Sequence, residues 1–289
     1  MKRRKFWLLS ASLLLLTAAF GLISYPILSN YLSDRNRSEV RTEYYSRIEK
    51  MDDRTLWDAE KEAVKYNGLL SSGISDNSKG LVNTDYDTLL NINNDGIMGY
   101  VEIPAINVYL PIAHGTDAKT LENYVGHVVG SSLPVGGKGT HTVLSGHSGL
   151  AGQVMFNDLS QLKKGDTAYI HVLGKVLAYK VDSSSTVLPS DVSLLSIEPD
   201  SDELTLITST PVGVNTHRLL VHCSRTEYVP GEELSPETMT EPEQMQSDWI
   251  KQYVRGVCLG AAVLALAALI CCVREISRKN RGKRDVQNN

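Results

Sequence analysis

The chain has 289 residues, a formal net charge of −4 and only four cysteines. Its two basic tails, residues 1–5 and 274–289, hold ten Lys and Arg and two acidic residues, which leaves 19 of the 29 basic and 31 of the 33 acidic residues between them. A central net charge of −12 disfavours nucleic acid as a partner. The seven histidines have no Cys or His at metal-ligand spacing, so we expect no metal site and no other cofactor.

Two apolar runs bracket the chain. Residues 6–28 carry no charge and exceed the roughly 20 apolar residues that span a bilayer. The alternative, a cleaved signal peptide, normally has a shorter apolar core. Residues 253–273 contain the uncharged "GVCLGAAVLALAALICCV" and form the second expected transmembrane helix. The basic tails predict that both termini are cytoplasmic, which gives a two-pass protein of the cell membrane with an extracellular centre.

The segment before the central domain, residues 29–95, is predicted to be an extracellular helical stalk followed by a flexible linker. Its helical part carries an apolar stripe at three- and four-residue spacing, which includes Tyr44 and Ile48. Residues 67–95 are rich in Ser, Asn, Asp and Gly, which is typical of a mobile loop. Residues 229–250, which follow the central domain, are acidic and predicted to be a second linker.

Residues 96–228 show short β segments separated by turn residues. The stretch "TAYIHVLGKVLAYKV" predicts a hairpin with Gly174 and Lys175 at its tip. About seven strands over this length favour a mainly β fold, a closed or nearly closed barrel with short helices. Cys223 is the only cysteine of this region, so no disulfide can form within it.

Three polar residues stand at predicted strand ends. His147 follows an apolar strand in "VLSGHSGL", Ser209 ends the strand in "TLITSTP", and Arg218 begins the next strand in "NTHRLL". Each alone has an ordinary structural reading, as a strand-end histidine, a turn serine and a surface arginine. Together they supply a nucleophilic hydroxyl, an imidazole that carries protons, and a guanidinium whose N–H groups can stabilise an oxyanion. No acidic residue at a telling spacing completes a triad, although Asp182 and Asp191 stay open as candidates.

At these residues the chain resembles a known family. The segments "DGIMGYVEIPAINVYLPIAHGT", "GHVVGSSLPVGG", "HTVLSGHSGL" and "TLITSTPVGVNTHRLLV" are similar, in this order, to signatures of class C sortases, the pilus-assembling transpeptidases of Gram-positive bacteria. The resemblance implies a β-barrel in which a cysteine cleaves the Thr-Gly bond of an LPXTG-like sorting signal. A pilin lysine or a cell-wall amine then resolves the acyl enzyme, so pilins and surface proteins are the implied partners.

The resemblance assigns His147 and Arg218 to the family's catalytic histidine and arginine, and it places Ser209 at the catalytic cysteine. A cysteine reacts as a thiolate, whereas a serine hydroxyl has to lose its proton to an oriented base during attack. Ser209 is an engineered change, a natural loss of the nucleophile, or a working serine variant. Cys223 lies five residues after Arg218 and therefore points to the opposite strand face, where it is expected to be packed.

A second departure concerns the lid of class C sortases. Their Asp-Pro-aromatic segment is missing, because no proline occurs between Pro26 and Pro104. We therefore expect His147 and Ser209 to be accessible. Three function classes follow: a membrane-anchored sortase of very low activity, an inactive homologue that binds pilins or sorting signals, and a structural surface barrel. The last leaves the placement of the three polar residues unexplained.

Overall fold

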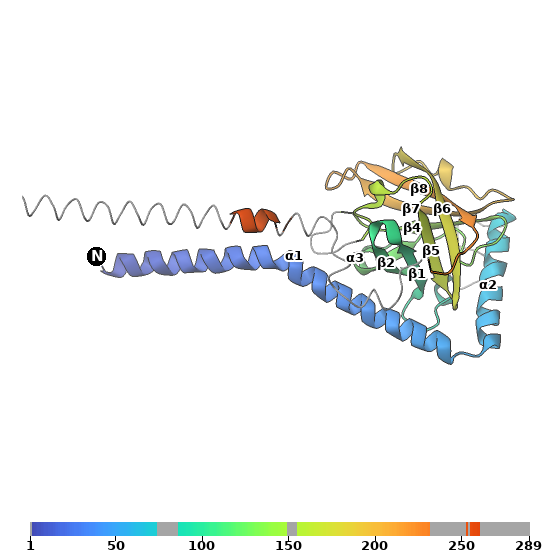
Figure 1. Ribbon diagram of the computed structural model, residues 1–289, viewed down its shortest axis with the longest axis horizontal. Coiled ribbons are helices and arrows are strands. Elements are labelled where there is room, and N and C mark those ends of the chain that lie inside the picture. Colours follow the sequence, from blue (N-terminus) through green and yellow to red (C-terminus); the bar gives the residue numbers. More distant parts are fainter. Residues whose placement is uncertain (1, 74–85, 149–154, 232–252, 254, 261–289) are drawn as a thin grey trace, which may run out of the picture. The chain divides into compact units, whose positions relative to one another are not determined.

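The computed structural model describes residues 2–73, 86–148, 155–231, 253 and 255–260 (Figure 1). The chain divides into two units, residues 24–245 and a second unit of residues 1–23 with 246–289. Within the described residues, no helix combines the length and the apolar character that crossing a bilayer requires. Most of the predicted second span, at residues 254 and 261–273, lies outside the described part of the chain.

The larger unit contains a closed barrel of eight strands in the order β1-β2-β3-β4-β7-β8-β6-β5. Strands β2 and β3 pair in parallel, as do β4 and β7, and the other neighbours are antiparallel. The strands are β1 (Ile97–Ile103), β2 (Val108–His114), β3 (Val125–His127), β4 (Thr140–Ser145), β5 (Thr167–Val172), β6 (Lys175–Val187), β7 (Asp202–Thr210) and β8 (His217–Thr226). The predicted mainly β barrel is confirmed.

The strand predictions hold where the sequence pattern is long. The hairpin of β5 and β6 turns at Leu173 and Gly174, where both residues have positive φ and Gly174 tolerates this without strain. The eighth strand, β3, was not predicted, because its three residues are too few to show an alternating pattern. Strand β6 also continues for six residues beyond the predicted apolar segment, through the polar run that starts at Asp182.

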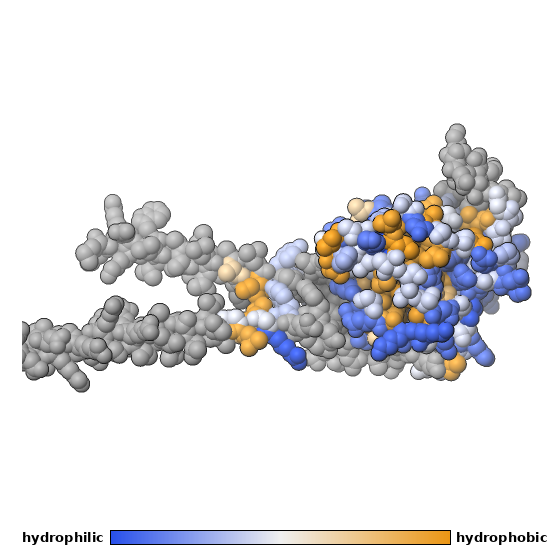
Figure 2. All heavy atoms as spheres, turned by 90° about the horizontal axis from the view of Figure 1, so that it is seen from above, coloured by the Kyte–Doolittle hydropathy of each residue, from blue (hydrophilic) through white to orange (hydrophobic). Residues whose placement is uncertain are grey.

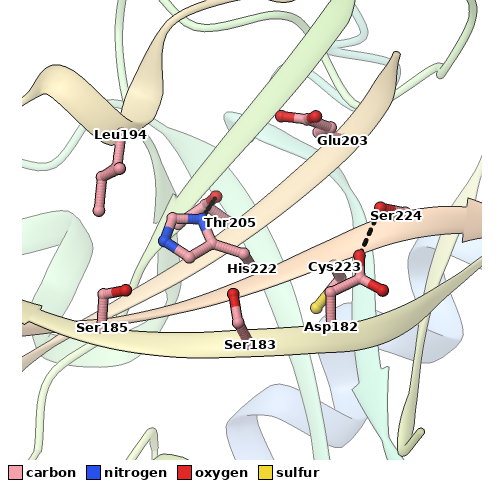
Figure 3. Close-up of a pocket in the computed structure, with 9 residues that line it drawn as sticks. All are labelled: Asp182, Ser183, Ser185, Leu194, Glu203, Thr205, His222, Cys223 and Ser224. Atoms are coloured by element: carbon pink, nitrogen blue, oxygen red, sulfur yellow. Dashed lines mark hydrogen bonds between the residues drawn. The ribbon is translucent and has the colours of Figure 1, made fainter. Parts of the chain in front are cut away.

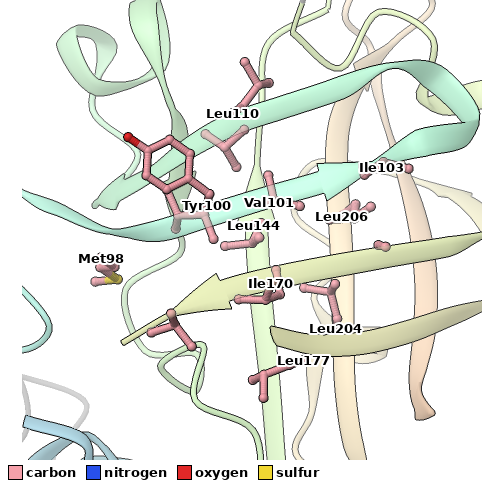
Figure 4. Packing of buried hydrophobic residues seen from close by; sticks show 14 of the residues in the cluster. Met98, Tyr100, Val101, Ile103, Leu110, Leu144, Ile170, Leu177, Leu204 and Leu206 are labelled. Carbon is pink, nitrogen blue, oxygen red and sulfur yellow. The ribbon is translucent and has the colours of Figure 1, made fainter. Parts of the chain in front are cut away.

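The barrel interior is filled by apolar side chains from every wall (Figure 4). On β7, Leu204 and Leu206 are fully buried and point inward, while Thr205 between them belongs to the outer face. Alternation of this kind follows from the two-residue period of a strand. It also fixes the outer face of β7, because Glu203, Thr205, Ile207 and Ser209 share one side.

In the described part of the chain, two α-helices precede the barrel: α1 (Lys2–Lys50) and α2 (Asp53–Ser71). The predicted apolar stripe of α1 is confirmed at Tyr44 and Ile48, which join the barrel core. The Tyr44 hydroxyl donates to the Met98 carbonyl at 3.2 Å and accepts from the Leu173 amide at 3.2 Å. The last part of α1 is therefore fixed to β1 and to the β5–β6 turn.

The predicted linker begins too early. Residues 67–71 belong to α2, and Asn67 is only 3% exposed. Its side chain accepts from the Leu133 amide at 2.7 Å and donates to the Leu133 carbonyl at 3.1 Å. A polar side chain in this role looks like a loop residue in a sequence, because the partner is 66 positions away.

The end of the predicted linker is also held to the barrel. The helix η1 (Tyr86–Thr88) is followed by Leu89 and Leu90, which are buried. The Tyr86 hydroxyl lies 2.8 Å from His127 Nδ1 and accepts from the Gly115 amide at 3.2 Å. Residues 74–85, the centre of the predicted linker, lie outside the described part of the chain.

Candidate functional site

The structure brings the three predicted site residues to one level of three neighbouring strands. Ser209 of β7 pairs directly with Arg218 of β8. On its other side β7 runs parallel to β4, with Ser145 opposite Ile207. Continuing this register by two residues places His147 beside Ser209. Since adjacent strands lie about 4.8 Å apart, both partners are within side-chain reach of Ser209.

All three residues belong to the outer face of the barrel. Ser209 lies two residues after Ile207 and is thus on the side opposite the inward-facing Leu204 and Leu206. Arg218, as its directly paired neighbour, shares that side. His147, Ser209 and Arg218 are each half-buried, so a ligand can reach them from solvent. This agrees with the expectation that the site is accessible.

Three hydrogen bonds fasten the segment that carries His147 to the end of β7. The Gly146 amide donates to the Ile207 carbonyl at 3.0 Å, and the Thr208 hydroxyl donates to the Gly146 carbonyl at 2.8 Å. The Ser148 hydroxyl donates to the Ser209 carbonyl at 2.7 Å. The backbone on both sides of His147 is therefore held against the strand of the candidate nucleophile.

Phe156 supports the same segment from the interior. It is fully buried, and its amide donates to the His147 carbonyl at 2.9 Å. A Cβ atom at Gly146 would lie 2.7 Å from the Phe156 ring, closer than any side chain tolerates. The glycine before His147 is therefore required by close packing.

Arg218 is oriented by the loop between β7 and β8. Its Nη1 donates to the carbonyls of Asn215 at 3.3 Å and His217 at 3.1 Å. A guanidinium has five N–H donors in a planar fork, so donors remain for a ligand oxygen near Ser209. This matches the role of an oxyanion or carbonyl clamp.

Apolar side chains are exposed on the two loops beside the site. Figure 2 views the protein from above, the side on which β6, β7 and β8 lie in Figure 1, and shows hydrophobic patches among polar residues. The exposed apolar residues of the β6–β7 and β7–β8 loops are Leu188, Val192, Leu194, Val212 and Val214. Exposed apolar surface around a polar centre is typical of a peptide-binding groove.

No acidic residue joins His147 in the described structure. Asp182 accepts a hydrogen bond from Ser224, and Asp191 accepts from the Ser193 hydroxyl at 2.7 Å, so both candidate carboxylates are engaged elsewhere. Among the described residues, none hydrogen-bonds the His147 ring. The arrangement therefore lacks the orienting group of a serine triad. The same part of the chain has no cluster of three or more His, Cys, Asp or Glu suited to a metal.

Cys223 occupies the inner face, as its spacing from Arg218 predicts. It is 2% exposed and belongs to the core. Burial, with a smaller contribution from Asp182, raises the pKa of its thiol to about 12. A thiol of this kind is not ionised near neutral pH, so Cys223 is not a candidate nucleophile.

Sequence reasoning missed the residues that position His147. Ser148 and Thr208 are short polar residues next to the predicted site residues, and only the parallel pairing of β4 with β7 shows that they bond across it. Phe156 lies nine residues after His147 in a segment without a periodic pattern. The feature that identifies Phe156 is its contact with Gly146, and this contact is visible only once the fold is known.

Comparison with known proteins gives one family. The sortase domain matches residues 101–226. Sortase D of Bacillus subtilis is 33% identical over 130 residues, which are 44% of this chain and 63% of that protein. The chain thus spans a little under two thirds of the length of this relative.

Solved structures of sortases match more of the chain. Sortase C1 of Streptococcus agalactiae is 40% identical with a TM-score of 0.62, over 65% of this chain and 98% of that one. Clostridium perfringens sortase C, solved with the C-terminal cell wall sorting motif, is 42% identical with a TM-score of 0.57, over 65% of this chain and 97% of that one. The neighbours therefore include class C enzymes.

Proposed function

Because the chain belongs to the sortase family, we propose that it is a class C sortase-like protein whose outer groove binds LPXTG-like sorting signals. The observation that carries this is that His147, Ser209 and Arg218 lie side by side, at the same height, along the neighbouring strands β4, β7 and β8 and their ends. Sortases are transpeptidases with a cysteine nucleophile, and Ser209 stands at that position in this chain. We propose accordingly that the groove is retained and that its turnover is very low.

In this proposal each of the three groups has a role. A nucleophile at position 209 attacks the threonine carbonyl of the sorting signal, and Arg218 donates to the oxygen that becomes negative. The Thr-Gly bond then breaks, the glycine amine leaves with a proton from His147, and the threonine stays as an acyl ester or thioester. An incoming amine attacks the threonine carbonyl and forms the new amide, while the bond between that carbonyl and the group at position 209 breaks. The proton that the amine loses passes to His147, which returns it to the released oxygen or holds it beside the released thiolate.

The serine weakens the first step. A thiol can be ionised before attack, with His147 already protonated to serve the leaving amine. A hydroxyl stays protonated, so His147 has to remove the proton during attack, and among the described residues no partner orients its ring for that task. The slow step is therefore acylation, and binding of the sorting signal does not depend on it.

We also propose the cellular setting that the sequence pattern predicts. Residues 6–28 and 253–273 anchor the protein as two transmembrane helices, and the barrel faces the cell exterior. The implied partners are pilins or other surface proteins with sorting signals, and the acceptor is a pilin lysine or a cell-wall amine. Protection of the whole chain from external protease in wall-stripped cells would contradict this topology.

A second candidate function is that of an inactive homologue that binds pilins or sorting signals as an assembly factor. The observation that favours it is the absence of an oriented base beside the Ser209 hydroxyl in the described structure. Both candidates use the same groove and differ only in whether an acyl enzyme forms. The codon at position 209 of the encoding gene distinguishes an engineered serine from a natural one.

The test is the Ser209→Cys variant of the full chain with a fluorogenic LPXTG-like peptide. We expect cleavage to appear or rise by at least about 100-fold, since the substitution exchanges oxygen for sulfur with little change in volume. Adding His147→Ala or Arg218→Ala should abolish the gain. The unsubstituted protein should bind the peptide with little turnover. A folded Ser209→Cys protein that forms no acyl enzyme would show that the groove no longer catalyses transfer.

A further inference from the structure

A hollow opens on the outer face of β6, β7 and β8, next to the one-turn helix η4 (Ser193–Leu195) (Figure 3). Its volume is about 330 Å³. The ionisable groups of its polar lining are Asp182, Glu203 and His222, and its lining contains no Lys or Arg. Thr205 of this hollow precedes Ser209 by four residues, which corresponds to about 13 Å along a strand. The hollow is therefore separate from the reacting position.

A chain of hydrogen bonds fixes the proton positions around the hollow. His141 Nδ1 lies 2.8 Å from the Ser196 carbonyl oxygen, and its Nε2 lies 2.7 Å from Thr205 Oγ1. Because a carbonyl only accepts, neutral His141 has its proton on Nδ1 and accepts the Thr205 hydroxyl at Nε2. Thr205 Oγ1 is then the acceptor for His222 Nδ1, 3.0 Å away. His222 consequently has a bare lone pair on Nε2.

That lone pair has no partner in the described structure. His222 Nε2 is buried and accepts no hydrogen bond, although its ring projects into the hollow (Figure 3). Burial lowers the pKa of His222 and His141 lowers it further, while Glu203 and Asp182 act in the opposite direction. A buried acceptor without a donor is unfavourable, and in native proteins it calls for a functional explanation. The group that would pair with this lone pair is a hydrogen-bond donor.

We propose that this hollow binds an organic ammonium group, the side chain of a lysine on a protein that docks on this face. The ammonium donates to His222 Nε2, and the carboxylates of Glu203 and Asp182 supply the negative charge that it needs. Its three donors match several separate acceptors, whereas the described residues form no cluster suited to a metal ion. The methylene stem packs on Leu194, which is 44% exposed.

This lysine is not the amine that resolves an acyl enzyme, because the hollow is about four residues of strand away from Ser209. The proposal does not depend on the sortase chemistry, since it uses no residue of the candidate catalytic site. It adds a recognition site for a basic side chain beside the proposed groove for the sorting signal.

The test follows the His222 nitrogen resonances of the full-length, ¹⁵N-histidine-labelled protein. The probes are Nα-acetyl-lysine methylamide and its Nε-acetylated counterpart, which has the same stem without the charge. We expect only the first to shift the Nε2 resonance, in a saturable way. Glu203→Gln and Asp182→Asn should each weaken its binding by at least about tenfold. Asp200→Asn is the matched control, because Asp200 is 93% exposed and lies outside the hollow.

The outcomes separate the sources of the signal. Saturable binding of n-butylamine as well would support recognition of the ammonium group itself. Equal shifts with the acetylated probe, or equal weakening by Asp200→Asn, would overturn the proposal in favour of nonspecific contact or long-range charge. A saturable shift with K⁺ or Ca²⁺ alone, and none with the lysine probe, would overturn it in favour of an inorganic cation. A folded protein that responds to no probe would overturn it outright.

Discussion

His127 makes the stability of the barrel dependent on acid. It lies on β3, is fully buried, and has a hydrogen-bond partner at each ring nitrogen. Nδ1 lies 2.8 Å from the Tyr86 hydroxyl, and Nε2 lies 2.9 Å from the Ser132 carbonyl. The carbonyl requires a proton on Nε2, so Nδ1 accepts from Tyr86 and the ring is neutral. Adding a second proton would place a charge in the interior.

The size of the effect follows from the pKa of His127. Burial, with a smaller effect of His114, lowers it from 6.5 to about 4, while the Ser132 carbonyl acts in the opposite direction. The unfolded chain therefore binds more protons than the native protein between these values, and stability falls as the pH falls. The contribution is fully present above pH 6.5 and amounts to about 3 kcal/mol. By pH 4.5 about 2.5 kcal/mol of it should be lost.

The assay is urea denaturation of the full chain at pH 7.5 and pH 4.5. His127→Gln keeps an amide donor and acceptor but cannot titrate. The loss in free energy of unfolding between pH 7.5 and pH 4.5 should therefore be about 2.5 kcal/mol smaller for this variant than for the unsubstituted protein. His217→Gln is the control, since His217 lies at the solvent-facing end of β8. An equal pH dependence of the His127→Gln variant and the parent would refute the reasoning.

Two further predictions concern packing. In a Ser209→Cys background, Gly146→Ala should lower the free energy of unfolding by about 1–3 kcal/mol and reduce peptide cleavage, because its methyl group would overlap the Phe156 ring. The control is Gly68→Ala, which has open space around it and should change neither denaturation nor cleavage. Asn67→Ala should cost about 1–3 kcal/mol in urea denaturation, since it leaves the Leu133 amide without its acceptor, while the Leu133 carbonyl keeps the Val135 amide as a donor. The exposed Lys65→Ala should stay within about 0.5 kcal/mol, and equal losses for the two variants would contradict the assigned role of Asn67.

The barrel could be predicted because its strands carry their pattern locally. Alternation in β7 identifies Leu204 and Leu206 as inward residues, and the turn at Gly174 joins two such strands. That Ser209 and Arg218 lie opposite each other also follows from the sequence, since a short loop joins their antiparallel strands. The position of His147 beside them could not be derived in this way. It depends on the parallel pairing of β4 with β7, two strands that are far apart in sequence.

What the sequence could not provide are contacts between distant polar residues. The composition around Asn67 predicts a linker because composition indicates only the local preference for secondary structure. The two hydrogen bonds of the Asn67 side chain are made to Leu133, which is distant in the sequence. The network of His141, Thr205 and His222 joins three strands, and each member alone is an ordinary polar residue of a strand. Histidines without ligand spacing exclude a metal motif, but they do not exclude a hydrogen-bond network.

The side chain at position 209 can change without disturbing the rest of the candidate site. The Ser209 side chain lies on the outer face and takes no part in the core, while its backbone is held by β8 and by the Ser148 hydroxyl. His147 and Arg218 are positioned by backbone partners that are independent of the side chain at 209. The fold and the positions of His147 and Arg218 are therefore independent of the side chain at position 209. It follows that an active transpeptidase and an inactive binding protein can share this structure and differ by one atom.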